Sequence, residues 1–294
     1  MIINNANLEA LRTGFKTTFQ AGLKAGASLY ALLATVVTSS TKVETYGFLG
    51  ELPRFRKWIG DKRIRSIAEK AYQLTNESFE ATIGIHKDKI RDDNLGLYGP
   101  MVNGWGKSAG QLNDQLVFDA LRDGHLKPCY DGQNFFDTDH PVGDGGDVYS
   151  NMTDGAGPAW YLVDCSQAIK PILLQERQAP TFDMVTDMTD SHVFKTGEYL
   201  MGGEARAAAG YTYPQLAHRS KAVLNAANFQ AARDAMAALV DDEGQPLEVR
   251  PTHIIVGSSN LAAAKAIFEA QNQAGGASNI WWKAVEVVEA KRLA

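Results

Sequence analysis

Four residues in the segment 129–141 have the side chains of a hydrolytic metal site: Asp131, Asp137, Asp139 and His140. Carboxylates and an imidazole are ligands that a divalent ion accepts. The segment also has the pattern of a hairpin, because Asp131-Gly132 is a common two-residue turn and short acidic side chains hydrogen-bond nearby backbone. Two aromatic residues follow the turn and would pack inward. Since no second His or acidic motif has a recognisable ligand spacing, the sequence favours a turn over a metal centre.

A Gly-Lys-Ser tripeptide at residues 106–108 suggests phosphate binding as another chemistry. A phosphate-binding loop needs a glycine five positions before Gly106, so that backbone N–H groups can wrap the phosphates. Met101 occupies that position, and no buried strand leads directly into the tripeptide. The sequence therefore argues against a nucleotide site.

Residues 54–65 form a cationic segment in an acidic protein. Six of these twelve residues are basic and one, Asp61, is acidic, while Phe55 and Trp58 lie among them. Such a segment suits a nucleic-acid patch, an oligomer contact or a solvated charged face. The nucleic-acid interpretation predicts salt-sensitive DNA binding by the monomer.

Composition excludes several classes of protein. The chain has 294 residues, 45% hydrophobic and 21% charged, as expected for one large or two medium globular domains. Its formal net charge of −5 gives no overall attraction to DNA or to an anionic membrane. Cys129 and Cys165 lie far apart and match no metal spacing, which suits a reducing compartment. The apolar run at 25–37 is too short for a membrane span, and we expect no secretion signal.

Hydrophobic periodicity predicts the elements that position these residues. Apolar residues spaced by three and four predict an amphipathic helix from Leu8 to about Leu23, with glycines weakening its far end. Alternation over residues 79–85 predicts a half-buried strand with its odd-numbered residues inward. A further helix is predicted over residues 112–123, ended by Gly124.

The second half of the chain mixes short strands and helices. Residues 142–158, rich in Gly, Asp and Asn, predict a long surface loop. Ser258 or Ser259 would cap the last helix. Because the elements show no regular βαβ alternation, the sequence indicates an α+β fold. The predicted strands cover residues 160–163, 171–174, 195–206, 252–256 and 284–288, and the predicted helices residues 229–240 and 260–271.

Motifs along essentially the whole chain match one family. They are Leu52-Pro53, Arg56, Trp58-Ile59-Gly60, Tyr72, Asn76, Phe79-Glu80, Thr82-Ile83, Asp92-Asp93, Gly96, Tyr98, and residues 129–136, 139–141, 170–177, 205–206 and 210–211. In these motifs the chain resembles the major head subunit, protein T, of Mu-like bacteriophages and prophages. Lys62 stands where the family pattern has arginine, and Arg91 where it has an acid. These two departures change charge partners rather than the fold.

The resemblance implies the α+β fold shared by the major capsid proteins of tailed phages. It implies an N-terminal arm over residues 1–44 and an extended two-stranded loop over residues 45–85. A peripheral domain with a spine helix would span residues 86–159. A mainly axial domain would span residues 160–294 and return to the peripheral domain. The loop would lie over a neighbouring subunit, and its basic and aromatic residues would make the intersubunit contact. These residues are Arg54, Arg56, Lys57, Trp58, Lys62 and Arg63.

The function implied by the resemblance is structural. Many copies of a major capsid protein would form hexamers and pentamers that close an icosahedral shell around double-stranded DNA. The implied partners are other head proteins, such as a scaffold, protease, portal or decoration protein. No catalysis, cofactor, metal, membrane or sequence-specific DNA binding is implied, and the virion would assemble in the bacterial cytoplasm. Lys57 and Lys62 are candidates for covalent crosslinking, but the sequence places no suitable acid, so we expect none.

Two other functions stay open from the residues alone. A shell of the same fold would enclose an enzyme cargo instead of a genome, as encapsulins do. A metal-dependent hydrolase would use the four residues of the 131–140 cluster. Stoichiometric metal would favour the hydrolase, whereas self-assembly into shells would favour the capsid protein.

Overall fold

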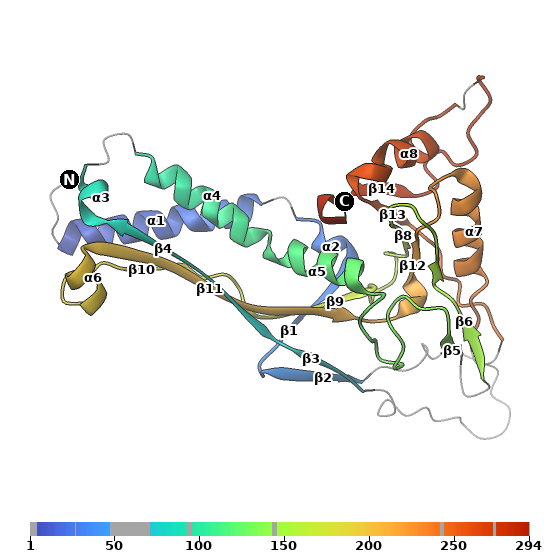
Figure 1. Cartoon of the computed structure of the whole chain (residues 1–294), viewed down its shortest axis with the longest axis horizontal. Helices are drawn as coiled ribbons and strands as arrows, with labels where there is room; N and C mark the ends of the chain where they lie inside the picture. The colour runs from blue at the N-terminus through green and yellow to red at the C-terminus, as the bar shows by residue number, and fades with distance from the viewer. Residues whose placement is uncertain are drawn as a thin grey trace.

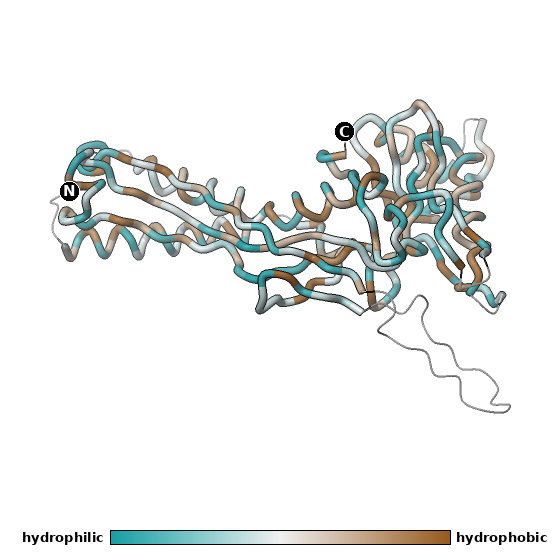
Figure 2. Tube along the Cα trace, turned by 60° about the horizontal axis from the view of Figure 1, so that its bottom comes forward, coloured by the Kyte–Doolittle hydropathy of each residue, from teal (hydrophilic) through white to brown (hydrophobic). Residues whose placement is uncertain are grey.

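A computed structural model describes residues 5–26, 28–47, 71–92, 96–142, 146–241, 244–272 and 275–293. In these residues the molecule has an elongated half, in which long helices run along a long sheet, and a globular half built on a second sheet (Figure 1). Hydrophobic and hydrophilic residues alternate along the elongated half (Figure 2). The predicted α+β class is confirmed.

The long sheet is organised around β11 (Glu198–Tyr211). Its first part pairs antiparallel with β4 (Glu77–His86) and with β10 (Asp183–Val185). Its last part pairs with β9 (Ile172–Gln178), which in turn pairs parallel with β1 (Ala34–Thr38). The strand predicted over residues 195–206 therefore begins later and runs farther than expected.

The strand predicted over residues 79–85 is present as β4, but its predicted buried face is only partly buried. Ile85 is buried and Phe79 is half-buried, whereas Ala81 and Ile83 are exposed. β4 pairs only with β11 in this sheet, so it is an edge strand. The helices that cover β11 leave part of the inner face of β4 open to solvent.

The helix predicted from Leu8 is confirmed as α1 (Asn5–Ala25), with Leu8 and Phe19 buried. It lies beside α4 (Tyr98–Gly110), and both helices cover the same face of the long sheet (Figure 1). A Cβ at Gly22 would lie 2.2 Å from the Asn103 carbonyl oxygen of α4. The glycine that predicted a weak helix end thus permits close packing of two backbones.

Two sequence predictions are settled by α4 and the next helix, α5 (Leu112–Asp123). The Gly-Lys-Ser tripeptide lies inside α4, which confirms that it forms no phosphate-binding loop. The predicted packing helix coincides with α5, and Leu121 is fully buried. Gly124 follows it, so the predicted end of the helix is confirmed, and this glycine adopts a right-handed conformation. A Cβ there would lie 2.9 Å from the Phe136 ring, and this crowding is what requires glycine.

The globular half contains a sheet in the order β14-β13-β8-β12-β7. Its centre is β8 (Trp160–Val163), which is completely buried and pairs antiparallel with both neighbours. Those neighbours are β12 (Ala217–Ser220) and β13 (His253–Val256). The flanking strands are β7 (Met152–Thr153) and β14 (Glu286–Glu289).

Two helices complete this half, α7 (Ala226–Ala237) and α8 (Ser258–Phe268). Phe229 of α7 packs edge to face on Phe268 of α8, with ring centroids 4.6 Å apart. Gly257, not a serine, caps α8, so the predicted serine cap is wrong. Because α8 joins the parallel strands β13 and β14, the fold contains a βαβ unit that the sequence pattern did not predict.

The long surface loop predicted over residues 142–158 is wrong in part. The segment contains β6 (Asp147–Tyr149), paired with β5 (His140–Val142), and then β7. Asn151 is buried, and its side-chain amide donates to the carbonyl oxygens of Phe135 (2.8 Å) and Pro214 (3.0 Å). These buried hydrogen bonds hold a polar segment inside the fold.

Within the described residues, no helix has the length and apolar character needed to cross a membrane.

The remaining elements are short. The short elements are α2 (Tyr30–Leu33), β2 (Val43–Gly47), β3 (Ala71–Thr75), α3 (Lys87–Arg91), α6 (Ser191–Thr196) and the 3-10 turns Pro214–Leu216 and Lys291–Leu293.

Candidate functional site

The residues predicted for the intersubunit contact lie outside the described residues: Arg54, Arg56, Lys57, Trp58, Lys62 and Arg63. The chain that carries them is described on both sides. β2 and β3 pair antiparallel, from Val43 opposite Thr75 to Gly47 opposite Ala71. The chain therefore leaves the described structure after Gly47 and returns to it at Ala71, and both points lie at the same end of a two-stranded ribbon.

Buried side chains fix this ribbon to the long sheet. The Tyr46 hydroxyl donates to Gln175 Oε1 at 2.7 Å, and Gln175 on β9 is fully buried. At the other end of the ribbon, the Asn76 amide donates to Ser39 Oγ (2.8 Å) and to the Thr41 carbonyl oxygen (2.9 Å). The direction in which the ribbon projects is therefore set by hydrogen bonds across three segments.

Glu44 closes the turn between β1 and β2. Its Oε1 accepts hydrogen bonds from Thr41 N (3.0 Å), Ser39 Oγ (2.9 Å) and Ser40 N (2.9 Å). These bonds, the Thr41 amide first, lower the pKa of Glu44 to about 2. The carboxylate that organises this turn thus stays ionised well into the acid range.

The second candidate, the 129–140 segment, is a hairpin closed by a buried chain of hydrogen bonds. Asp131 Oδ2 lies 2.7 Å from His140 Nδ1, and Asp131 Oδ1 accepts from Cys129 Sγ and from Gln133 N, each at 3.0 Å. His140 is fully buried, and the Asp131 side chain is 4% exposed. Gly132 supplies the left-handed residue of the turn, with φ +94°.

The pKa shifts of Asp131 and Cys129 indicate that their hydrogen bonds have a structural role. Burial raises the pKa of Asp131, but the hydrogen bonds from His140 and Cys129 outweigh it and leave this pKa below its ordinary value. Burial, and next the bond to Asp131, raise the pKa of the Cys129 thiol, which stays protonated and donates. Both carboxylate oxygens of Asp131 are thus engaged within the protein.

The four-residue metal cluster considered from the sequence does not form. Asp137 accepts from the backbone N–H groups of Thr138 (2.8 Å) and Asn134 (3.3 Å), and Asp139 is exposed. In the part of the chain that the structure describes, the potential ligand atoms that lie together belong to Cys129, Asp131 and His140. Sequence reasoning missed Cys129, which lies two residues before Asp131. The predicted hairpin turn is observed, with both following phenylalanines buried inward.

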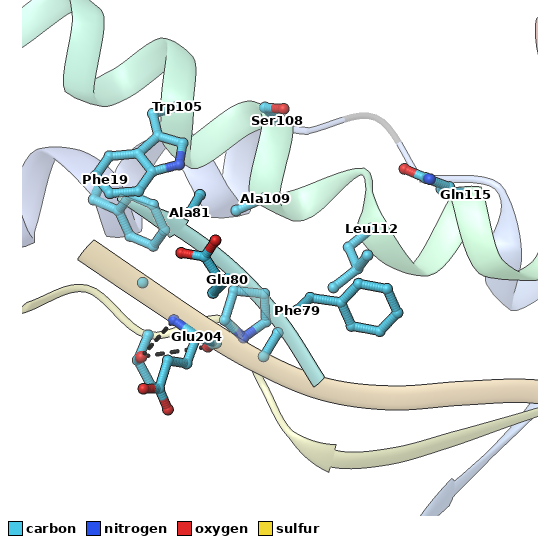
Figure 3. Close-up of a pocket in the computed structure, with 14 residues that line it drawn as sticks. Phe19, Phe79, Glu80, Ala81, Trp105, Ser108, Ala109, Leu112, Gln115 and Glu204 are labelled. Carbon is cyan, nitrogen blue, oxygen red and sulfur yellow. Dashed lines mark hydrogen bonds between the residues drawn. The ribbon is translucent and has the colours of Figure 1, made fainter. Parts of the chain in front are cut away.

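A groove of about 230 Å³ lies between α4, α5 and the long sheet (Figure 3). One end of the groove is aromatic: the ring centroids of Phe19 and Trp105 lie 5.5 Å apart, and Phe182 packs on both rings. Phe79 and Leu112 line the other end.

Sequence comparison places the chain with phage head proteins. Residues 8–293 match the family model described as Mu-like prophage major head subunit gpT. The major capsid protein of Escherichia phage Mu is 39% identical over 289 residues, which cover 95% of each chain. The Mu-like prophage FluMu major head subunit of Haemophilus influenzae is 41% identical over 277 residues, covering 91% of this chain and 90% of that protein.

Solved structures agree with the sequence comparison. A chain of the bacteriophage JBD30 procapsid has a TM-score of 0.86 and 41% identity, covering 98% of this chain and 99% of its own length. A chain of the JBD30 capsid has a TM-score of 0.81 and 32% identity, with full coverage of both chains. The similarity extends over both halves of the molecule and confirms the capsid fold expected from the motifs.

Proposed function

We propose that this chain builds a shell from hexamers and pentamers and that the shell encloses double-stranded DNA. The chain belongs to the Mu-like prophage major head subunit family and is a major capsid protein. Like its homologues, it is a structural protein rather than an enzyme. It assembles with further copies of itself into an icosahedral shell. The observation that carries the proposal is the match to a procapsid chain along nearly the whole length of both chains.

We assign the parts of the subunit on the same basis. The N-terminal arm takes residues 1–44, the extended loop 45–85, the peripheral domain 86–159 and the mainly axial domain 160–294. The pairing of β2 with β3 supports a loop that projects from the long sheet. Because β4 lies in that sheet, we propose that the projecting part of the loop runs between β2 and β3. α5, buried along one side, suits a spine helix.

The basic segment of this loop is the proposed clamp between subunits. Arginine guanidinium groups bind carboxylates in bidentate pairs, and Trp58 supplies apolar area to the contact. Binding of other head proteins is supported by the JBD30 capsid that is decorated with minor capsid protein trimers. The net charge of −5 suits a shell that holds DNA without sequence-specific binding. The proposal includes assembly of this shell in the bacterial cytoplasm.

Light scattering on a size-exclusion column, followed by negative-stain microscopy of the earliest fraction, tests assembly. The wild-type chain, expressed alone and with its candidate scaffold, should yield rings, tubes or closed shells. A monomer at high concentration in both cases would contradict the proposal. Nucleic acid recovered from shells assembled in cells would separate a genome container from an enzyme compartment, which would yield a stoichiometric protein cargo instead.

A further inference from the structure

One edge of the long sheet is open. β4 pairs with β11 along Glu77–His86 (Figure 1), and no other strand among the described residues pairs with its outer edge. A strand at an edge keeps a row of backbone N–H and C=O groups that another strand can pair with. β4 has 10 residues, most of them exposed, and is about twice as long as a typical strand. It contains no proline and no lysine, the residues that most often prevent pairing at an edge.

Apolar side chains lie uncovered beside this edge. Ile85 is buried under the helices, and side chains alternate along a strand, so Phe79, Ala81 and Ile83 project from the same face of β4. Ala81 and Ile83 are nevertheless exposed, Ile83 by 37%. The groove shown in Figure 3 runs past Phe79 and Ala81. The isolated subunit therefore combines an unpaired strand edge with an apolar row that has the pattern of a buried face.

The sequence of β4 is complementary to itself in an antiparallel pair. When Ala81 of one copy lies opposite Ala81 of a second copy, Phe79 lies opposite Ile83 and Glu80 opposite Thr82, and each of these pairs occurs twice. Pairs of an aromatic with a β-branched side chain stabilise a sheet. Opposite residues project from the same face, so the two apolar rows join across the pair. No glutamate lies directly opposite another in this register.

Other registers fit less well. A shift by one residue would turn the apolar row of one copy to the opposite face of the other. A shift by two residues in one direction would place Glu80 directly opposite Glu80 of the second copy, where like charges repel. The same shift in the other direction would pair Phe79 with Ile85, which α1 and α4 already bury. The register with Ala81 opposite Ala81 is therefore the one that these side chains favour.

The symmetry of such a pair suits a closed shell. An antiparallel pair of identical strands has a twofold axis, and each copy gives the same surface to the contact. An icosahedral shell, into which this chain assembles, contains twofold axes. The contact also leaves neither copy with a free edge at β4, so it closes on itself and does not extend into a fibre.

We propose that β4 pairs antiparallel with β4 of a second copy of this chain, with Ala81 at the twofold axis. The long sheets of the two subunits then form one continuous sheet, and Ala81 and Ile83 become buried. The inference rests on the proposed function and adds a second contact to it, which uses a strand edge and is separate from the clamp of residues 54–65.

Disulfide formation in assembled particles tests this register. Opposite residues of an antiparallel pair have Cα atoms about 4.5–5.5 Å apart, a separation that a disulfide spans. In Ala81→Cys particles treated with copper phenanthroline, two introduced thiols should form one disulfide, while dissolved oxygen takes up the two electrons and two protons. We expect most chains to migrate as dimers on a non-reducing denaturing gel. The wild-type chain measures any background from its two native cysteines.

Glu77→Cys is the matched control on the same strand. In this register Glu77 lies opposite Ile85, eight residues from Glu77 of the second copy, so the two introduced thiols lie about 26 Å apart at roughly 3.3 Å per residue. This variant should stay monomeric on the gel. Dimers of Glu77→Cys in the same yield as those of Ala81→Cys would show unspecific oxidation and overturn the proposal.

Mixed particles give an independent readout of the register. ¹⁵N-labelled Glu80→Cys chains are assembled with unlabelled Thr82→Cys chains and then oxidised. Mass spectrometry should find mostly disulfides that join the two variants, because Glu80 faces Thr82, whereas each residue lies two positions from its own counterpart. Disulfides that join only like variants would contradict this pairing.

The outcomes separate this inference from the proposed function. If the wild-type chain forms no particles under any condition, the proposed function fails and the inference fails with it. If particles form and Ala81→Cys chains remain monomeric on the gel, the proposed function stands and the twofold pairing is wrong.

A reconstruction of wild-type particles decides the matter if the cysteine variants do not assemble. It should show β4 beside β4 of a neighbour, with the two Ala81 residues opposite each other. A different chain segment along this edge, or an edge open to solvent, would overturn the proposal.

Discussion

His140 Nδ1 lies 2.7 Å from Asp131 Oδ2 in a hairpin from which solvent is excluded, since the His140 side chain is fully buried. This pair joins the two ends of a segment whose middle places Phe135 and Phe136 in the core. The contact is therefore structural, and removing it should lower the free energy of unfolding of the whole subunit.

Replacing Asp131 by alanine should destabilise the subunit by about 3–5 kcal/mol, because it leaves buried donors on His140 and Cys129 without an acceptor. Urea unfolding of the dissociated chain measures the change. Asp139→Ala is the control, since Asp139 is exposed, and should change the unfolding free energy by less than about 0.5 kcal/mol. Equal effects of the two substitutions would contradict the structural role of the pair.

The subunit should lose stability with acidification through His218. Burial lowers the pKa of this histidine from 6.5 to about 4. Because the folded value is depressed, the unfolded chain binds a proton first, and stability falls as pH decreases from about 6.5 to about 4. The full effect is on the order of 3 kcal/mol.

A His218→Gln variant isolates that contribution. Its unfolding free energy should change less with pH than that of the wild-type chain between pH about 6.5 and about 4, because the titrating group is gone. Chemical denaturation at a series of pH values supplies the comparison. Parallel curves for the two proteins would show that His218 titrates alike in the folded and unfolded states.

Close packing of α1 on α4 makes Gly22→Ala destabilising. Alanine favours a helix over glycine by about 1 kcal/mol, but its Cβ at this position would lie 2.2 Å from the Asn103 carbonyl oxygen. The helices must separate, at a net cost of about 1–3 kcal/mol. Gly14→Ala in the same helix is the control: its Cβ would meet no atom within 4 Å, so thermal unfolding should show a small stabilisation. A stabilising Gly22→Ala would mean that the helices are not in this contact.

The ribbon should loosen when Tyr46 is replaced by phenylalanine. The change removes the hydroxyl that donates to the buried Gln175 oxygen, at a cost of about 1–2 kcal/mol. Hydrogen exchange should become faster in β2 and β3 while β8 is unaffected. Unchanged exchange in the ribbon would show that this hydrogen bond does not anchor it.

Local patterns in the sequence predicted much of the secondary structure. The stripe of α1 and the stripe of α5 follow directly from apolar spacing, and both are buried as expected. Burial of β4 was mispredicted because alternation in a strand does not reveal whether a helix covers the whole face. The parallel pairing of β13 with β14 depends on contacts between segments distant in the sequence, which periodicity does not encode.

Sites were harder to predict than elements. The sequence drew attention to four residues of the 131–140 segment, yet folding brings Cys129 to Asp131 and His140 and directs Asp137 to backbone amides. The pairing of Glu80 with Glu204 joins residues 124 positions apart and depends on strand register alone. A charge pattern read along one segment cannot reveal such a pair.

The most direct test of the central claim is a cryo-electron microscopy reconstruction of particles formed by the wild-type chain. The account predicts an icosahedral shell of hexamers and pentamers in which each subunit keeps its long sheet and helices and contacts a neighbour through residues 54–65. Discrete soluble monomers, or an assembly without hexamers and pentamers, would contradict the shell architecture. A shell in which residues 54–65 contact no neighbouring subunit would contradict the proposed clamp alone.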